Sequence, residues 1–249
     1  MTTRIIVPMN IDDPQSLVIA VAYAERILGA MGDRRIILLT HTKKELQDGF
    51  LVDHLGSDAK LLRKGQVVKL RSGAHIRHET LKTLRQPSSP TVVVAFYAED
   101  ELLESVDALR QLRGIVVVPD RANMIDAWTA RWNPTVHGAT TAQAPVPLIG
   151  DAVIVGAFEA LSARINLSQS DMHAGDKEIA TEFLRILRAK GHQADSDMIK
   201  SWAIQHGWKP GAAASLAALA KRILSTASSP DLSKIHDPKG RYERWGGVW

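Results

Sequence analysis

Residues 132–150 read WNPTVHGATTAQAPVPLIG, and this stretch separates two parts of the chain that have different patterns. It carries no Asp, Glu, Lys or Arg and holds three prolines and two glycines, a composition typical of a loop or linker. Before it, β-branched runs alternate with helical patterns, whereas only helical patterns follow it. The sequence therefore predicts an α/β domain over residues 1–132, a linker over 133–150, a helical domain over 151–227 and a basic, aromatic tail over 228–249.

Short apolar runs in the first part indicate buried strands. Continuous apolar runs suit a parallel sheet that is covered on both faces. Because helical patterns alternate with these runs and crossovers are right-handed, the sequence predicts a five-stranded, parallel, doubly wound, Rossmann-like sheet and leaves the strand order open. The predicted strands are residues 4–8, 35–40, 66–70, 92–98 and 115–119. The first predicted helix begins at Asp13-Pro14 and ends near Gly32, and the second begins at Thr42. The other three predicted helices span residues 75–85, 100–112 and 122–132.

The second part has the pattern of a small all-helical domain. Apolar residues recur at helical spacing, and glycines or polar residues stand where helices begin and end. Four short helices joined by brief turns predict a compact bundle. These helices are expected at residues 151–165, 176–190, 195–206 and 210–227.

Positive charge is concentrated in one window, residues 60–85, which holds eight Lys or Arg and a single acid, Glu79. The whole chain carries only +4, so all of its excess positive charge arises there. Such a patch attracts anions. The candidate anion-binding residues are Arg63, Lys64, Lys69 and Arg71. The alternative is an exposed edge whose Lys and Arg prevent edge-to-edge pairing. The window contains no Phe, Tyr or Trp, so stacking on single-stranded nucleic acid is not favoured.

Polar residues follow several of the predicted strands. Ligands in open α/β sheets bind at the carboxyl ends of the strands, near the switch in strand order. This rule selects Asp13, His41, Asp100 and Asp120 as candidate catalytic residues, and it also selects Tyr97 and Glu99 beside them. The alternative for the three aspartates is a purely structural role as helix N-caps.

The opening of the chain, IIVPMNIDDPQSLVIAVAYAERI, resembles the opening of universal stress proteins, in which a strand is followed by an Asp, a Ser and a long helix. The resemblance covers about the first thirty residues and implies an α/β fold, and some members of that family bind ATP. The family's G-x-x-G phosphate loop has no counterpart here, because PDRANMIDAW follows the last predicted strand. The chain also lacks the P-loop, the G-x-G-x-x-G dinucleotide fingerprint and the G-x-S-x-G nucleophile elbow.

The remaining features bound the class of protein. The chain has no Cys, its N-terminus lacks a basic segment followed by an apolar run, and no apolar stretch is long enough to span a bilayer, so we expect a cytoplasmic protein. Asp171, His173 and Asp176 form a local cluster, but no second cluster would complete a metal site, and the sequence indicates no cofactor. Trp245 and Trp249 are expected to dock on this chain or on a partner, which includes a second copy of the chain.

These observations predict a ligand- or partner-binding protein without an identifiable catalytic site. One alternative is an enzyme that acts on an anionic small molecule at the strand ends. The other is a protein that associates with nucleic acid through residues 60–85. A located anion would best separate these hypotheses.

Overall fold

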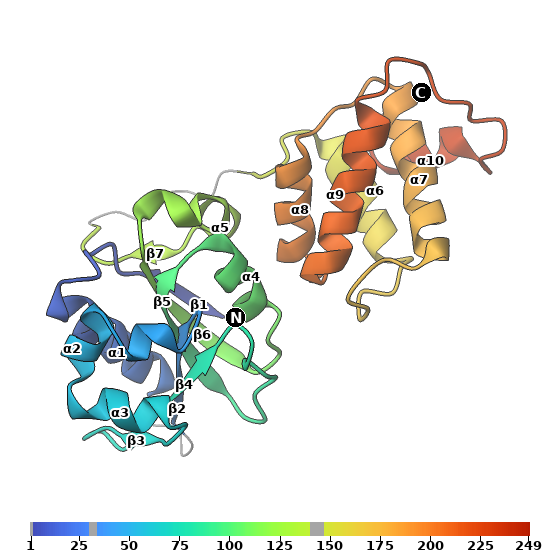
Figure 1. Ribbon diagram of the computed structural model, residues 1–249. Helices are drawn as coiled ribbons and strands as arrows, with labels where there is room; N and C mark the ends of the chain where they lie inside the picture. Colours follow the sequence, from blue (N-terminus) through green and yellow to red (C-terminus); the bar gives the residue numbers. More distant parts are fainter. Residues whose placement is uncertain (1, 30–33, 140–146) are drawn as a thin grey trace. The chain divides into compact units, whose positions relative to one another are not determined.

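The computed structural model describes residues 2–29, 34–139 and 147–249. The chain divides into two compact units, Met1–Ala144 and Pro145–Trp249 (Figure 1). The predicted helix end at Gly32 lies outside the described residues. None of the described helices is both long and apolar enough to cross a bilayer.

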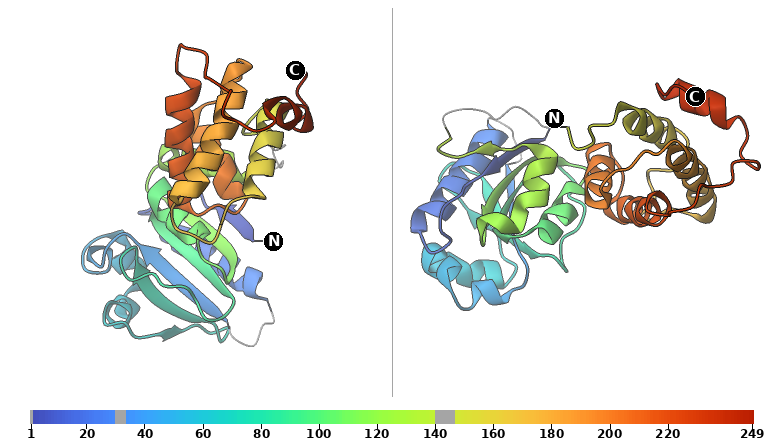
Figure 2. Two further views of the ribbon diagram at one scale, coloured as in Figure 1. Left: turned by 90° about the vertical axis from the view of Figure 1, so that its right-hand side faces the viewer. Right: turned by 90° about the horizontal axis from the view of Figure 1, so that it is seen from above.

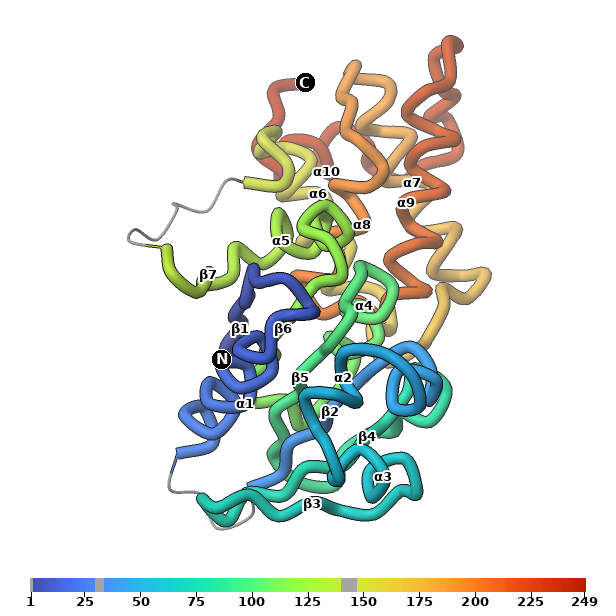
Figure 3. Tube along the Cα trace, turned by 60° about the vertical axis from the view of Figure 1, so that its left-hand side comes forward, coloured from blue at the N-terminus to red at the C-terminus, as the bar shows by residue number. Residues whose placement is uncertain are grey.

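The first unit is built on one mostly parallel sheet with the strand order β3-β4-β2-β5-β6-β1-β7 (Figure 3). Among the strand pairs of the described residues, only the short β3–β4 pair is antiparallel. The α/β class of the prediction is therefore confirmed, but the predicted count of five strands is wrong, because the described part of the chain forms a sheet of seven. The strands are β1 (Thr3–Ile6), β2 (Arg35–Thr40), β3 (Val68–Lys69), β4 (His75–Thr80), β5 (Thr91–Ala98), β6 (Leu112–Pro119) and β7 (Thr135–Val136).

Helices cover both faces of the sheet because its central strands are apolar on both sides. Val92 and Val94 pack into one apolar layer, and Val93 and Ala95 pack into the other. The first layer lies under α1, α2 and α3, and the second lies under α4 and α5. The bounds are α1 (Pro14–Leu28), η1 (Lys44–Leu46), α2 (Phe50–Leu55), α3 (Ser57–Arg63), α4 (Asp100–Asp107), η2 (Ala122–Ile125) and α5 (Asp126–Trp132).

The largest correction concerns residues 75–85, where the predicted helix is a strand, β4, followed by a loop. Residues 75–80 read HIRHET, and Ile76, His78 and Thr80 are buried while the residues between them face outward. This is the two-residue period of a strand. His78 and Thr80 conceal the pattern because they are polar, yet His78 is buried against Thr40 with 2.8 Å between Nε2 and Oγ1. The predicted third strand at residues 66–70 shrinks to the two-residue edge strand β3.

Other boundaries moved for local reasons. The Thr42 amide and hydroxyl donate to the Glu45 carboxylate, but the N-cap of the 3₁₀ turn η1 that follows is Lys43, and no side chain caps it. Gly49, with a φ of 118°, starts α2 separately. The helix expected over residues 100–112 ends at Asp107, since β6 begins at Leu112.

The predicted linker belongs in part to the sheet. Thr135 and Val136 form β7, which pairs in parallel with Ile5 and Ile6 of β1. Asp107 fixes α5, the helix just before β7. The Asp107 side chain is 1% exposed and accepts hydrogen bonds from the indole nitrogens of Trp128 at 3.0 Å and Trp132 at 2.7 Å. The ordered α/β fold therefore extends past the predicted boundary at residue 132.

The second unit is a helical bundle, as Figure 2 shows. Asp151 and Asp195 accept hydrogen bonds from the first backbone amides of α6 and α8, as N-caps do. Gly191 and Gly207, both with positive φ, follow α7 and α8. The helices are α6 (Ala152–Ser162), α7 (Ala174–Ala189), α8 (Ser196–Gln205), α9 (Pro210–Leu224) and α10 (Pro238–Arg244).

The C-terminal segment packs on this bundle and holds a fifth helix, α10, that the sequence analysis did not predict. Trp245 is 6% exposed and stacks on Phe183 of α7 with 4.7 Å between ring centroids. Gly156 of α6 permits this docking, since a Cβ there would lie 2.8 Å from the carbonyl oxygen of Trp245. Residues 238–245 are thus part of the bundle.

Candidate functional site

The carboxyl edge of the sheet contains a switch point between β2 and β5. The segment after β2 covers one face of the sheet, whereas α4, which follows β5, covers the other. His41 follows β2, and its Nε2 lies 2.9 Å from Oε1 of Glu99, which follows β5. The fold therefore brings the predicted His41 beside Glu99, a second residue that the strand-end rule selects.

The three candidate aspartates at this edge have different roles. Asp13 is the N-cap of α1 and accepts a hydrogen bond from the Gln15 amide at 2.9 Å. Asp100 instead accepts from the Trp128 amide at 2.9 Å, and burial raises the pKa of its carboxyl despite this bond. Asp120 lies 3.9 Å from the Arg121 Nε. Among the described residues, no hydrogen bond or ion pair joins these aspartates to His41 or to one another. Each of the three aspartates thus has separate polar partners.

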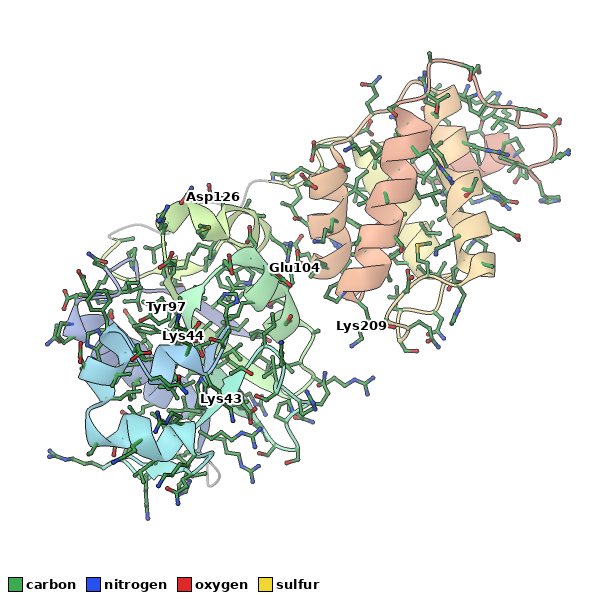
Figure 4. The ribbon with its side chains drawn as sticks, viewed as in Figure 1. Lys43, Lys44, Tyr97, Glu104, Asp126 and Lys209 are labelled. Atoms are coloured by element: carbon green, nitrogen blue, oxygen red, sulfur yellow. The ribbon has the colours of Figure 1, made fainter. Side chains whose placement is uncertain are left out.

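A small pocket of about 310 Å³ opens at the same edge, lined by Ile11, Lys44, Phe50 and Tyr97. Figure 4 labels Lys44 and Tyr97. Tyr97 interrupts the β5–β6 register and has a φ of 57°, which is unusual for a residue with a side chain. Burial raises the pKa of its hydroxyl. Glu45 and Asp48 also line this pocket. One lysine against two acids does not favour an anionic ligand here.

A larger pocket lies on the sheet face where a helix is missing. Residues 81–90, all of them described, connect β4 to β5 as a loop. This connection therefore supplies no helix to cover β4 on the face of the sheet that α4 and α5 cover elsewhere. The resulting pocket has a volume of about 750 Å³. Its floor includes Ile37 of β2 and Thr91 of β5, and Val67 and Pro87 add apolar surface at its sides. We call it the sheet-face pocket.

Basic side chains dominate the polar lining of the sheet-face pocket. Arg35, Arg77 and Arg85 carry three positive charges, and Glu79 is the single acid that lines it. Arg77 forms an ion pair with Glu79 at 2.8 Å, yet its side chain is 47% exposed. His75 also lines the pocket. The pocket therefore presents an excess of guanidinium groups beside an apolar floor.

The loop that borders the sheet-face pocket is fixed to the rest of the unit. The Gln86 side chain donates to the carbonyl of Ala108 at 3.1 Å and accepts from the Arg110 amide at 2.9 Å. Thr83 Oγ1 accepts from the Thr80 amide at 2.9 Å, and Leu84 packs against the apolar layer under α4. These contacts hold one side of the pocket in place.

The structure places the four predicted anion-binding residues in different segments and not together in one site. Lys69 of β3 pairs with His75 of β4, so both side chains stand on the face that carries the sheet-face pocket. Arg63 and Lys64 lie at the end of α3, and Arg71 lies in the turn before β4. All four are exposed, and within the described part of the chain no acid pairs with them. None of these four residues is among those that line the sheet-face pocket.

Sequence reasoning missed Arg35, Arg77 and Arg85 as a set. Arg77 and Arg85 fall inside the basic window, but the helix predicted at residues 75–85 assigned their side chains the wrong direction. The alternation in HIRHET was the available signal, since it places His75, Arg77 and Glu79 on one face. The contribution of Arg35 required the β2–β4 pairing.

The aromatic tail residues lie beside a polar network within their own unit. His192 joins two segments, because its Nδ1 lies 2.5 Å from Asp151 Oδ2 and its Nε2 lies 2.8 Å from the Tyr242 hydroxyl. Trp249 is 42% exposed and receives the Lys190 ammonium 3.8 Å from its ring centroid. Both tryptophans therefore contact their own chain, Trp245 through Phe183 and Trp249 through Lys190. Among the described residues, no group of three or more His, Asp or Glu could hold a metal ion.

Residues 150–246, which lie within the second unit, match a family model described as a domain of unknown function, DUF1889. That description names no activity, ligand or partner. The chain has no significant match among curated proteins or solved structures.

Proposed function

We propose that the α/β unit is a binding module for an anionic small molecule that also has an apolar part, and that the ligand enters the sheet-face pocket. The observation that carries this proposal is the excess of positive charge from Arg35, Arg77 and Arg85 in the lining of a pocket of about 750 Å³. Typical pockets for small ligands have ~300–1,000 Å³ and combine apolar walls with a few polar groups.

The chemistry of the lining supports an anion over a cation or a neutral molecule. Guanidinium groups bind carboxylates and phosphates through paired, charge-assisted hydrogen bonds. Glu79 holds Arg77 in place, and its single negative charge cannot balance the three positive charges of the lining. Ile37 and Val67 would contact the apolar part of the ligand. Val67 is 53% exposed, so covering it would remove apolar surface from water.

Binding is favoured over catalysis because, among the described residues, no hydrogen bond joins a hydroxyl nucleophile to a general base in the sheet-face pocket. The His41–Glu99 pair is the one contact between a histidine and an acid at the strand ends, and no hydroxyl nucleophile is bonded to it in the described residues. The enzyme alternative would place the reaction at the small pocket beside Tyr97, where Glu45 and Asp48 oppose an anionic substrate.

Isothermal titration calorimetry with inorganic pyrophosphate, citrate and adenosine monophosphate tests the proposal. At least one of these probes is expected to bind the intact chain. The double variant Arg35→Gln, Arg77→Gln is expected to bind it at least about ten-fold more weakly, since a hydrogen bond to a charged group contributes ~1.5–3 kcal/mol.

The matched control is Arg63→Gln, Arg71→Gln, which removes two exposed charges outside the pocket lining. It is expected to bind as the parent does. Equal weakening by both double variants would show that general charge, and not the sheet-face pocket, attracts the probe. Failure of all three probes to bind the parent would also overturn the proposal.

A further inference from the structure

The helical unit carries a basic groove of its own. Three pockets of about 520, 460 and 390 Å³ lie along α7, α9 and the segment after α9. The first shares Arg188 with the second and Arg222 with the third, so the three pockets adjoin one another, and we call them together the α7–α9 groove. Its basic lining residues are Lys177, Arg185, Arg188, Lys221, Arg222 and Lys234.

Within the described part of the chain, the bases that line this groove outnumber the acids near them: Asp231 interacts with Arg185, and Asp171, which lies outside the lining, interacts with Lys177. Two acids line it, and both already accept backbone hydrogen bonds: Asp195 from the Met198 amide and Asp231 from the Ser233 amide. Within the described residues, none of the six bases forms an ion pair. On the side of α10, by contrast, Arg241 pairs with Glu182 at 2.6 Å and Arg244 pairs with Asp237 at 3.2 Å. The unit thus pairs its bases near α10 and leaves them unpaired along the groove.

The groove suits a large, regular anion that approaches closely. The α9 surface before Lys221 carries small residues, the exposed Ala214 and Ala218 and the half-buried Ser215, and α9 itself contains no acid, although the Ser215 hydroxyl donates to the Asp171 carboxylate. No Phe, Tyr, Trp or His lines the three pockets. Bases of a single strand would therefore find nothing to stack on, whereas a phosphate backbone could lie against the flat helix face.

We propose that the α7–α9 groove binds the phosphates of a nucleic-acid duplex without reading its bases. Lys177 and Arg188 are eleven residues apart on α7, which corresponds to roughly 16 Å along a helix, or about five steps of one duplex strand. Arg188 is held in place, since its Nε donates to the carbonyl of Thr226 at 2.6 Å. Small residues on α9 cannot reach base edges, so the phosphate contacts would set affinity and not sequence preference.

The test measures the binding of short fluorescent duplexes, of both DNA and RNA and of different sequence, to the full chain by anisotropy between about 50 and 200 mM salt. The groove variant is Lys177→Gln, Arg185→Gln, Arg222→Gln, which changes three exposed side chains and leaves the anchored Arg188 in place. We expect its affinity at low salt to fall about ten-fold or more. The slope of log K against log salt should shrink by roughly 2–3, at ~0.9 for each phosphate that the protein no longer neutralises.

A matched control removes three charges elsewhere: Arg110→Gln, Lys239→Gln, Arg244→Gln. This control should keep both the affinity and the salt slope. Circular dichroism verifies that both variants are folded. If a variant is not, Arg222→Gln alone replaces the groove variant, with a slope change of roughly 1.

Several outcomes would overturn the proposal. One is that the parent chain binds no duplex, and another is that the groove and control variants weaken binding equally. The others are that the chain binds single strands more tightly than duplexes, or that it binds inorganic tripolyphosphate and no duplex. The proposal does not depend on the sheet-face pocket. The Arg35→Gln, Arg77→Gln variant should bind duplexes as the parent does, and the groove variant should keep the small-anion affinity, so the two proposals fail separately.

Discussion

At the residue scale, His78 shows how a polar side chain becomes part of a core. The single hydroxyl proton of Thr40 is donated to the carbonyl of Thr42 at 2.7 Å, so Thr40 accepts from His78 Nε2, which fixes the protonated nitrogen of the neutral ring. Burial lowers the pKa of His78 from 6.5 to about 4, although Glu79 and Glu45 oppose this shift.

This pKa predicts an acid-sensitive stability. As the pH falls below 6.5 the unfolded chain binds a proton at residue 78, whereas the folded chain binds it only near pH 4. The free energy of unfolding should therefore decrease between these values, by up to roughly 3 kcal/mol at ~1.4 kcal/mol for each pKa unit, and should be unaffected by His78 above pH 6.5. Urea denaturation at a series of pH values measures this slope.

The variant His78→Gln keeps a donor for Thr40 and should lose the corresponding part of the slope. His75→Gln, on the outward face of the same strand, should retain it. If the His78→Gln curve parallels that of the parent from pH 7 to pH 4, burial of a neutral His78 is not what makes the unit acid-sensitive.

At the element scale, the packing of α10 on α6 determines how a substitution of Gly156 affects stability. In a helix interior, replacing Gly by Ala ordinarily stabilises a protein by ~0.5–1 kcal/mol. At Gly156 the new Cβ would lie 2.8 Å from the carbonyl oxygen of Trp245 and 3.3 Å from its Cα, both of which are backbone atoms that cannot turn aside. The contact between α6 and the end of α10 therefore depends on the absence of a side chain.

We predict that Gly156→Ala destabilises the full chain, as measured by the melting temperature of the second unit. In a chain that ends at residue 236, the same substitution should be stabilising, because Trp245 is gone. The truncation itself should lower the melting temperature, since burial of an indole contributes a few kcal/mol at ~25 cal/mol per Å².

Gly175→Ala in α7, where no atom lies within 4 Å of the added Cβ, is the control and should be neutral or stabilising in both chains. A rise in melting temperature for Gly156→Ala in the full chain would mean that α10 does not pack on α6 in solution.

At the scale of the whole molecule, the two units have the features of independent domains. The two apolar layers of the sheet consist entirely of residues from the first unit. The helical unit buries its own large side chains, among them Phe158, Leu184 and Trp202, at 3% exposure or less. A core of this kind allows a domain of about 100 residues to fold alone.

We therefore predict that residues 1–144 and 145–249, expressed separately, each unfold in one cooperative transition when followed by circular dichroism. Each fragment should keep the affinity of its own site, for a small anion in the first and for a duplex in the second. A second fragment that lacks helical signal, or that folds only when the first is added, would show that the units share a core.

The sequence by itself determined the α/β class, the apolar central strands and the helices of the second part. These features depend on local periodicity and on local capping chemistry, such as Asp13 before α1 and Asp195 before α8. It also located the basic window, since charge is a property of composition. None of this required knowledge of which segments are neighbours.

Only the tertiary structure decided the features that depend on neighbours. β4 is a strand because β2 lies beside it and buries His78 on Thr40, which outweighs a pattern that had suggested a helix. The sheet-face pocket exists because Arg35 and Arg77 come from paired strands under a loop that replaces a helix. The α7–α9 groove likewise combines bases from helices that are distant in sequence. Such sites arise from the pairing and packing of remote segments, and a local pattern contains no information about which remote segments will meet.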